Sequence, residues 1–307
     1  MHLGDAEHDA ASRRARQSLS GLSIGDALGA EFYREILHSS IEEVVGQIEN
    51  EDVPVAPWRY TDDTEMALSI VQTLEEHHGI DQDALAAHFA RNFDPRRGYG
   101  SQAVHLLAAL RGGGAWRDLA PRIHGGQGSC GNGSCMRVAP LGAYFANDLD
   151  AVTEHARRSA VVTHAHPEGT AGAIAVAVAS AAAWQTRSGR SGRESFFDLV
   201  LRYTPAGATR DGIERARDLP PSTRPEIAAE RLGSGQEIKA QDTVPFSLWC
   251  AARHLDDYAS AIFAALKGLG DIDTTAAIAG GIVVMSDPEI PTYWRTAREP
   301  LPGFADC

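Results

Sequence analysis

Apolar residues recur along this chain with the spacing of α-helices. Eight segments place apolar side chains at every third or fourth position, and they cover residues 11–28, 64–77, 83–92, 101–110, 151–162, 169–186, 195–203 and 258–266. Alternating runs of β-branched residues, which would indicate strands, are nearly absent. The pattern therefore predicts an all-α protein, folded as a compact bundle of many helices.

Two polar stretches interrupt the helical pattern. Residues 206–224 are rich in proline and charge, and residues 233–245 are rich in glycine and polar side chains. Because helices of the same composition resume after each stretch, we interpret both as long connections within a domain. Residues 1–307 are accordingly predicted to form a single domain, with roughly the first 15 residues as a flexible tail.

Composition and charge narrow the choice of partners and compartment. The chain carries 28 Lys and Arg against 41 Asp and Glu, a formal charge of −13, which argues against nucleic-acid binding. Residues 171–184, the most apolar run, are too few to span a bilayer, which takes about 20 residues, and predict a buried helix. The 4 cysteines show no paired metal-type spacing and no apolar leader is visible, so we expect a cytoplasmic protein without membrane partners.

Acidic side chains gather at the start of two predicted helices. WRYTDDTEMALSI places Thr61, Asp62 and Asp63 before one helix, and GLGDIDTTAAIAGGIV places Asp271, Asp273 and Thr274 before another. A helix cap explains one such residue at each start, and taken alone each cluster is read best as a cap. Capping does not explain the surplus, because adjacent carboxylates repel one another unless a cation lies between them.

The residue types of the two clusters indicate which cation would suit them. Carboxylate and hydroxyl oxygens favour Mg²⁺ or Mn²⁺ and do not favour structural Zn²⁺. If the two helix starts converge, their carboxylates and hydroxyls suffice for two metal ions about 3.5–4 Å apart. The sequence thus predicts a binuclear metal site at helix N-termini, provided that tertiary structure brings the two clusters together.

Between the clusters lies a glycine-rich loop, GGQGSCGNGSCMRVAP, at residues 125–140. Its backbone N–H groups could cradle a phosphate before a helix that we expect to begin near Met136. An ordinary turn explains the same glycines equally well. His164 and His166 follow a predicted helix, and we assign neither of them to a metal.

The order of these motifs resembles the ADP-ribosylglycohydrolase family, which includes the dinitrogenase-reductase-activating glycohydrolase and the mammalian ADP-ribosylhydrolases. The matching segments are GLSIGDALGAEFY, WRYTDDTEMAL, GSCGNGSCMRVAPLGAYF, THAHPEGTAGAIAVA and GLGDIDTTAAIAGGIV. The resemblance implies a helical fold with two Mg²⁺ ions. By the same resemblance the metal ligands are Thr61, Asp62, Asp63, Asp271, Asp273 and Thr274.

The resemblance also implies a binding site and a catalytic set. The ADP-ribose diphosphate and adjacent ribose would be lined by Gly128, Ser129, Cys130, Gly131 and Asn132, with His164 in contact with the ligand. Many members have a glutamate where this chain has Tyr33, and the nearby acid here is Glu31. The catalytic candidates are therefore Asp62, Asp63, Asp271, Asp273 and Glu31.

The expected activity is magnesium-dependent hydrolysis of the N- or O-glycosidic bond that links ADP-ribose to a modified protein side chain, with arginine as the favoured acceptor. Reversal of a regulatory modification and immunity to an ADP-ribosylating toxin both fit this chemistry. The displaced Glu31 keeps open a non-catalytic ADP-ribose sensor. A purely structural protein does not need clustered carboxylates, and no GxGxxG motif follows a strand as a nicotinamide-dependent oxidoreductase requires.

Overall fold

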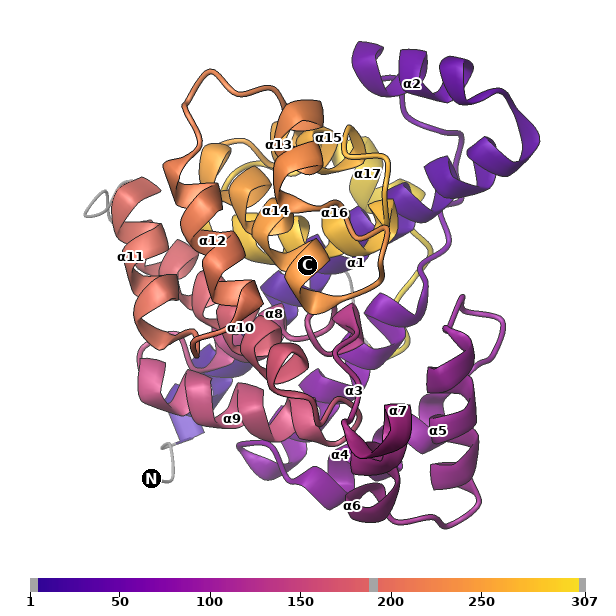
Figure 1. Ribbon diagram of the computed structural model, residues 1–307, viewed down its shortest axis with the longest axis vertical. Helices are drawn as coiled ribbons and strands as arrows, with labels where there is room; N and C mark the ends of the chain where they lie inside the picture. The colour runs from indigo at the N-terminus through magenta and orange to yellow at the C-terminus, as the bar shows by residue number, and fades with distance from the viewer. Residues whose placement is uncertain (1–4, 188–192, 304–307) are drawn as a thin grey trace.

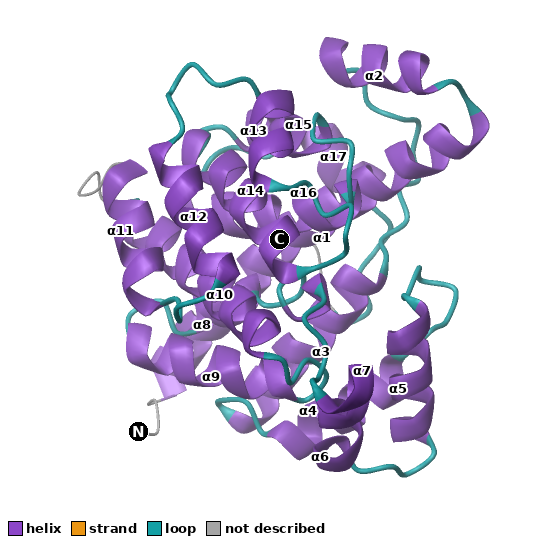
Figure 2. Cartoon of the chain, in the orientation of Figure 1, coloured by secondary structure: helices purple, strands orange, loops and turns teal. Residues whose placement is uncertain are grey.

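The computed structural model of the chain describes residues 5–187 and 193–303, shown in Figure 1. Helices and the loops that join them make up these ranges, and neither range contains a strand (Figure 2). Two isolated bridges join Trp58 to Arg298 and Gly131 to Lys239. The prediction of an all-α protein is confirmed.

The helices follow one another along the chain with short connections. The first part of the chain forms α1 (Asp5–His38), α2 (Ile41–Asn50), α3 (Asp62–His77), α4 (Gln82–Asn92), α5 (Ser101–Arg111), α6 (Trp116–Leu119), α7 (Ile123–Gly126), α8 (Ala139–Tyr144) and α9 (Leu149–Val161). The second part forms α10 (Pro167–Thr186), α11 (Arg193–Tyr203), α12 (Ala208–Asp218), α13 (Pro225–Leu232), α14 (Ala240–Arg253), α15 (Tyr258–Leu266), α16 (Ile272–Val283) and α17 (Thr292–Ala297). Short 3₁₀ turns lie at Ala120–Arg122, Asn132–Ser134 and Val284–Ser286.

Helix α10 lies at the centre of the bundle, where α8, α9, α11, α14 and α16 pack around it (Figure 1). Alanine is its commonest residue, and residues on every face of the helix are buried. A helix that is apolar all round is the kind expected at the core of a large domain. None of the helices in the described ranges is both long and apolar enough to cross a membrane.

Glycines bring α1 into close contact with α16. A Cβ atom built on Gly21 would lie 2.5 Å from the Gly280 carbonyl oxygen, and one on Gly25 would lie 2.3 Å from the Ala276 carbonyl oxygen. One turn further on, a Cβ on Gly29 would lie 2.6 Å from the Asp273 Cα. Larger side chains at these positions would force the two helices apart, so the glycines fix the middle of α1 against α16 along most of its length.

The eight helices predicted from periodicity are confirmed, with ends that differ by a few residues at most places. The predicted tail is the exception, since α1 begins at Asp5 and both Ala11 and Ala15 are fully buried. The start of α1 is mostly polar, but its alanines lie on one face that packs against the core. Residues 1–4 of the predicted tail lie outside the described residues.

The prediction of two long connections was wrong in part. The stretch 206–224 contains α12, whose Thr209, Gly212, Ile213 and Ala216 form one buried face against α14. Few of these side chains are large and apolar, which is why periodicity did not reveal the helix. The second connection ends at residue 239, because α14 begins at Ala240 and continues through Pro245, which packs against Gly212.

Candidate active site

Three helices bring acidic side chains to one point in the structure. Asp26 comes from the middle of α1, Asp62 and Asp63 begin α3, and Asp271 and Asp273 lie at the start of α16. One carboxylate oxygen from each of Asp26, Asp63 and Asp273 lies within 4.8 Å of the others. The two helix starts predicted to meet do so, and we call these five carboxylates the acidic cluster.

Asp26 is buried and holds the N-terminus of α3 in place. It accepts hydrogen bonds from the backbone N–H groups of Thr61 and Thr64, with nitrogen–oxygen distances of 3.0–3.1 Å. The hydroxyls of the same two threonines donate to it at 2.7 and 2.5 Å. The first N–H groups of a helix have no partner within the helix, so the carboxylate from α1 satisfies them and orients Thr61 toward Asp63.

The acidic cluster concentrates negative charge in the interior of the protein. None of its members forms an ion pair with a cationic side chain in the described ranges, and Asp63 Oδ1 is buried there without a hydrogen-bond partner. Burial, followed by the charge of Asp273, raises the pKa of Asp26 to about 7. The same two causes raise the pKa values of Asp62 and Asp271 well above the ordinary range.

The close carboxylates also change the pKa of Asp63. Burial, followed by the charge of Asp26, raises the pKa of Asp63 well above its ordinary value. Carboxylates that lie this close ionise together only when a positive charge neutralises them. Oxygen donors gathered around an unpartnered carboxylate atom fit a hard divalent cation, so the site passes this test for metal binding.

Hydrogen bonds from the glycine-rich loop and from α16 position the remaining carboxylates. The Asn132 side-chain amide donates to Asp271 Oδ2 at 2.6 Å and to the Thr243 hydroxyl at 3.0 Å. The backbone N–H of Thr274 donates to Asp273 Oδ1 at 3.0 Å. Asn132, predicted to line the ligand, therefore also orients a predicted metal ligand.

Two cavities meet at the acidic cluster. The loop cavity, of about 700 Å³, is lined by residues 127–133, by Asp62 and Asp63 and by His164. The arginine cavity, of about 950 Å³, is lined by Arg34, Arg59, Arg96 and Arg97. Both are bounded by Asp271 and Asp273, so the cluster forms part of the wall that they share.

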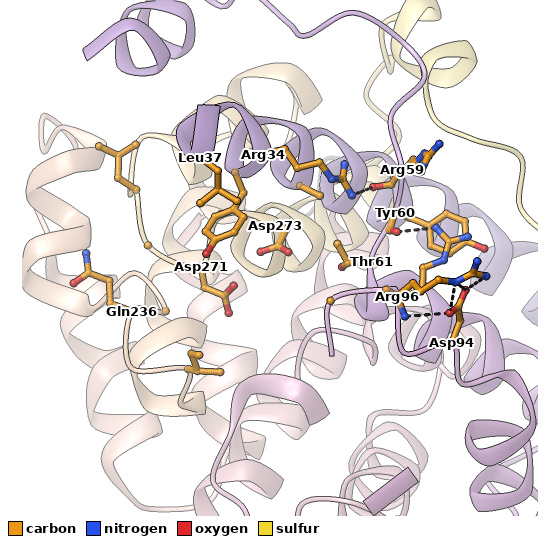
Figure 3. Close-up of a pocket in the computed structure, with 18 of the residues that line it drawn as sticks. Arg34, Leu37, Arg59, Tyr60, Thr61, Asp94, Arg96, Gln236, Asp271 and Asp273 are labelled. Atoms are coloured by element: carbon orange, nitrogen blue, oxygen red, sulfur yellow. Dashed lines mark hydrogen bonds and ion pairs between the residues drawn. The ribbon is translucent and has the colours of Figure 1, made fainter. Parts of the chain in front are cut away.

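Figure 3 shows the arginine cavity with Asp271, Asp273 and Thr61 toward its centre and with Arg59 and Arg96 on one side. Carboxylates pair with three of the four arginines that line it: Arg34 with Glu31, Arg96 with Asp94, and Arg97 with Glu299. The fourth, Arg59, has an exposed side chain that forms no ion pair with the residues the structure describes.

The loop cavity contains every residue predicted to bind the ligand, namely Gly128, Ser129, Cys130, Gly131, Asn132 and His164. Gly128 has a φ of +75°, and a Cβ there would lie 2.6 Å from the backbone nitrogen of His166. Only glycine accommodates both the left-handed conformation and the close approach. The helix expected near Met136 is instead a 3₁₀ turn, Asn132–Ser134, followed by α8.

Glu31 does not join the acidic cluster. Its carboxylate pairs with Arg34 at 2.5 Å and accepts the backbone N–H of Arg59 at 3.0 Å. It does not line either cavity among the described residues, whereas the exposed Tyr33 lines the arginine cavity. In this structure Glu31 therefore binds Arg34 and the backbone of Arg59, and its catalytic role stays a prediction.

Asp26 is the site residue that sequence reasoning missed. The signal was present, because Asp26 lies among Leu22, Ile24, Ala27 and Leu28, which occupy opposite sides of the helix and so indicate that it is buried all round there. A carboxylate in such a stretch needs a partner or a metal. The helix start that it holds is 35 residues further along the chain, so only the fold reveals that partner.

Comparison with known proteins agrees with this geometry. The model of the family described as ADP-ribosylglycohydrolase matches residues 7–305. The chain is 30% identical to ADP-ribosylhydrolase ARH3 of Xenopus tropicalis, covering 96% of this chain and 92% of that protein. It is also 30% identical to human ADP-ribosylhydrolase ARH3, covering 93% and 89% respectively.

A solved structure has a similar fold. The ADP-ribosylglycohydrolase-related protein complex superposes with a TM-score of 0.64 at 22% identity, over 95% of this chain and 94% of that one. At this level of identity the likeness concerns the fold alone.

Proposed function

The chain belongs to the ADP-ribosylglycohydrolase family, and from this premise we propose that it is a magnesium-dependent hydrolase that releases ADP-ribose from a modified protein side chain. The observation that carries the proposal is the acidic cluster in the wall between the loop cavity and the arginine cavity. A bond held at that wall would have ADP-ribose on one side and its acceptor on the other.

In this proposal the loop cavity holds ADP-ribose. The loop between Gly128 and Asn132 turns through one left-handed glycine. Among the described residues, the backbone N–H groups of Gly128, Gly131 and Asn132 already donate to other protein atoms, so those of Ser129 and Cys130 are the ones proposed to bind a phosphate. The volume of about 700 Å³ falls in the range of cavities that bind small molecules and cofactors. The distal ribose would then reach the carboxylates of Asp62 and Asp273, which line the same cavity.

The acidic cluster would hold the cations, with Thr61, Asp62, Asp63, Asp271, Asp273 and Thr274 as the proposed ligands and two Mg²⁺ ions as the proposed occupants. Mn²⁺ would suit the same oxygen donors. Bound cations supply Lewis acidity, which polarises ribose oxygens and lowers the pKa of water. Asp26 stays outside this ligand set, because threonine N–H and hydroxyl groups already engage both of its oxygens.

Cleavage at the anomeric carbon builds positive charge on the ribose, as in other glycosidases. The carboxylates of the cluster stabilise that charge by their proximity. Asp62 is half-buried, lines the loop cavity and accepts no hydrogen bond from another side chain of the described residues. We propose that Asp62 removes the proton from the attacking water.

Arginine is the acceptor predicted from the sequence, and serine is the alternative. The charges of the arginine cavity do not select between them, because Glu31, Asp94 and Glu299 pair with three of its arginines.

The acceptor is tested by comparing substrates with different linkages. We would incubate the protein with peptides ADP-ribosylated on arginine or on serine, and with an ADP-ribosylated nucleic acid, in Mg²⁺ or in EDTA, and measure released ADP-ribose by mass spectrometry.

Release that depends on Mg²⁺ is expected from one of these linkages. Asp273→Ala should abolish it, while Asp118→Ala, which removes an exposed carboxylate from α6, should leave it intact. Near-normal turnover by Asp273→Ala at saturating Mg²⁺ would overturn the proposed site. Stoichiometric binding of ADP-ribose without release from any linkage would support the sensor instead.

A further inference from the structure

Arg137 is a fully buried cation that forms no ion pair within the described residues. One of its terminal nitrogens, Nη2, donates to the Ser159 carbonyl oxygen at 3.2 Å and to the Thr163 hydroxyl at 2.8 Å. The guanidinium also lies 4.5 Å from the centre of the Phe89 ring. Ser159 is in the last turn of α9, where carbonyl groups lack helical partners, so Arg137 satisfies that helix end.

A hydrogen-bonded chain leads from Arg137 to the loop cavity. The Thr163 oxygen that accepts from Arg137 lies 2.7 Å from Nδ1 of His164. A guanidinium can only donate hydrogen bonds, which fixes the direction of the first step. The buried Thr163 hydroxyl must place its own proton elsewhere, and His164 Nδ1 is the acceptor that the described residues offer it.

We infer that Arg137 and Thr163 fix His164 in the tautomer that carries its proton on Nε2, so that the ring presents an N–H donor to the loop cavity. Nδ1 must accept the Thr163 proton and is therefore unprotonated in a neutral ring. Arg137 and Thr163 thereby act as positioning residues, and His164 is the group that touches the ligand.

The surroundings of Nε2 agree with this role. Within the described ranges the structure gives His164 Nε2 no hydrogen-bond partner. Two glycines lie beside it, since a Cβ on Gly131 would lie 3.3 Å from Nε2 and one on Gly133 would lie 3.1 Å from it. The absence of side chains at these two positions leaves the Nε2 edge open to the loop cavity, which His164 lines.

The charge state of the ring supports the same assignment. Burial, followed by the positive charge of Arg137, lowers the pKa of His164 to about 3. Burial also lowers the pKa of Arg137, to about 9, which leaves the guanidinium charged at neutral pH. A neutral imidazole with one fixed N–H is a donor suited to an uncharged or anionic oxygen, such as a ribose hydroxyl or a phosphate oxygen.

The ligand part of this inference rests on the proposed function, whereas the tautomer does not. We would label histidine with ¹⁵N and record long-range ¹H–¹⁵N correlations of the His164 ring at neutral pH, with His164→Gln to identify its signals. The expected pattern is a protonated Nε2 and an unprotonated Nδ1 in the protein without ligand. A ring protonated on Nδ1, or one that is doubly protonated, would overturn the inference.

Substitutions at Thr163 separate the hydrogen-bonded chain from simple packing. Thr163→Val keeps the shape of the side chain but removes the hydroxyl, while Thr163→Ser keeps the hydroxyl. In Thr163→Val the Nδ1-protonated form should appear and the Kd for ADP-ribose in Mg²⁺ should rise about tenfold, and Thr163→Ser should restore both. An unchanged ring spectrum in Thr163→Val would refute the role of Thr163, whether or not affinity falls.

The two measurements distinguish the inference from the function beneath it. A ring protonated on Nε2 in a protein that does not bind ADP-ribose would overturn the proposed function and leave the tautomer established. Tight binding and hydrolysis with a ring protonated on Nδ1 would overturn the tautomer and support the proposed function.

Discussion

The acidic cluster predicts that stabilisation by Mg²⁺ grows as the pH rises. The pKa of Asp26 is about 7 in the folded chain, against an ordinary value of 3.8. A carboxyl group with a raised pKa retains its proton in the folded state, so it favours folding at low pH. That contribution is lost as the pH rises from about 4 to about 7, because ionisation in the buried cluster becomes a cost.

The size of the effect follows from the pKa of Asp26. Without a cation, the cost of ionising this group grows from about 1.7 kcal/mol at pH 5 to about 4 kcal/mol at pH 7.5. A cation held by the neighbouring carboxylates would offset most of that cost, because its positive charge favours the ionised form of Asp26. Mg²⁺ should therefore stabilise the protein by about 2.5 kcal/mol more at pH 7.5 than at pH 5, which corresponds to about 4 °C in Tm for 307 residues.

Buried histidines change the stability of the protein with pH in the opposite direction, so the experiment must cancel their contribution. Burial lowers the pKa of His155 to about 4 and that of His164 to about 3. Their contribution to stability rises as the pH rises toward 6.5, where the unfolded side chains lose their protons. Neither residue belongs to the cluster, so this contribution is the same with and without Mg²⁺ and cancels in the difference.

The assay is thermal unfolding by calorimetry at several pH values between 5 and 7.5, with matched samples in Mg²⁺ and in EDTA. The quantity of interest is the difference in Tm between the two, plotted against pH. Asp63→Asn should flatten the plot, because it removes one of the interacting charges, whereas Asp118→Ala should not. A difference that is constant or that shrinks as the pH rises would refute the reasoning.

Three further predictions concern single residues. Asn132→Ala should raise the Mg²⁺ concentration at half-maximal turnover by about tenfold or more, because Asp271 loses the amide that orients it, and an unchanged Mg²⁺ titration would contradict this. Glu31→Gln should leave kcat within about threefold, because its carboxylate is paired with Arg34 and lines neither cavity. A hundredfold loss of kcat in a steady-state assay would instead identify Glu31 as the base. Gly128→Ala should raise the Kd for ADP-ribose by at least about tenfold in calorimetric titration. The reason is that a Cβ conflicts with the φ of +75° and with the neighbouring backbone. Binding at normal affinity would show that the loop adapts.

The sequence by itself determined the fold class and the chemistry of the site. Helical periodicity is a local property, since buried positions recur every three or four residues whatever the helix packs against, and eight helices were found from it. The surplus of carboxylates at two helix starts indicated a hard cation for the same reason, because like charges in adjacent positions repel in any fold. Where a helix buries mainly small residues, as α12 does, the local signal failed.

Tertiary structure alone decided which of these residues act together. Asp26 lies 35 residues from Thr61 and 247 from Asp273 along the chain. The glycines of α1 bring Asp26 close to Asp273, and Asp26 itself binds Thr61. Burial and mutual repulsion raise the carboxylate pKa values only after that packing exists. The same holds for Arg137, which forms no ion pair within the described residues and is linked to the cavity through Thr163, since both are properties of a folded interior.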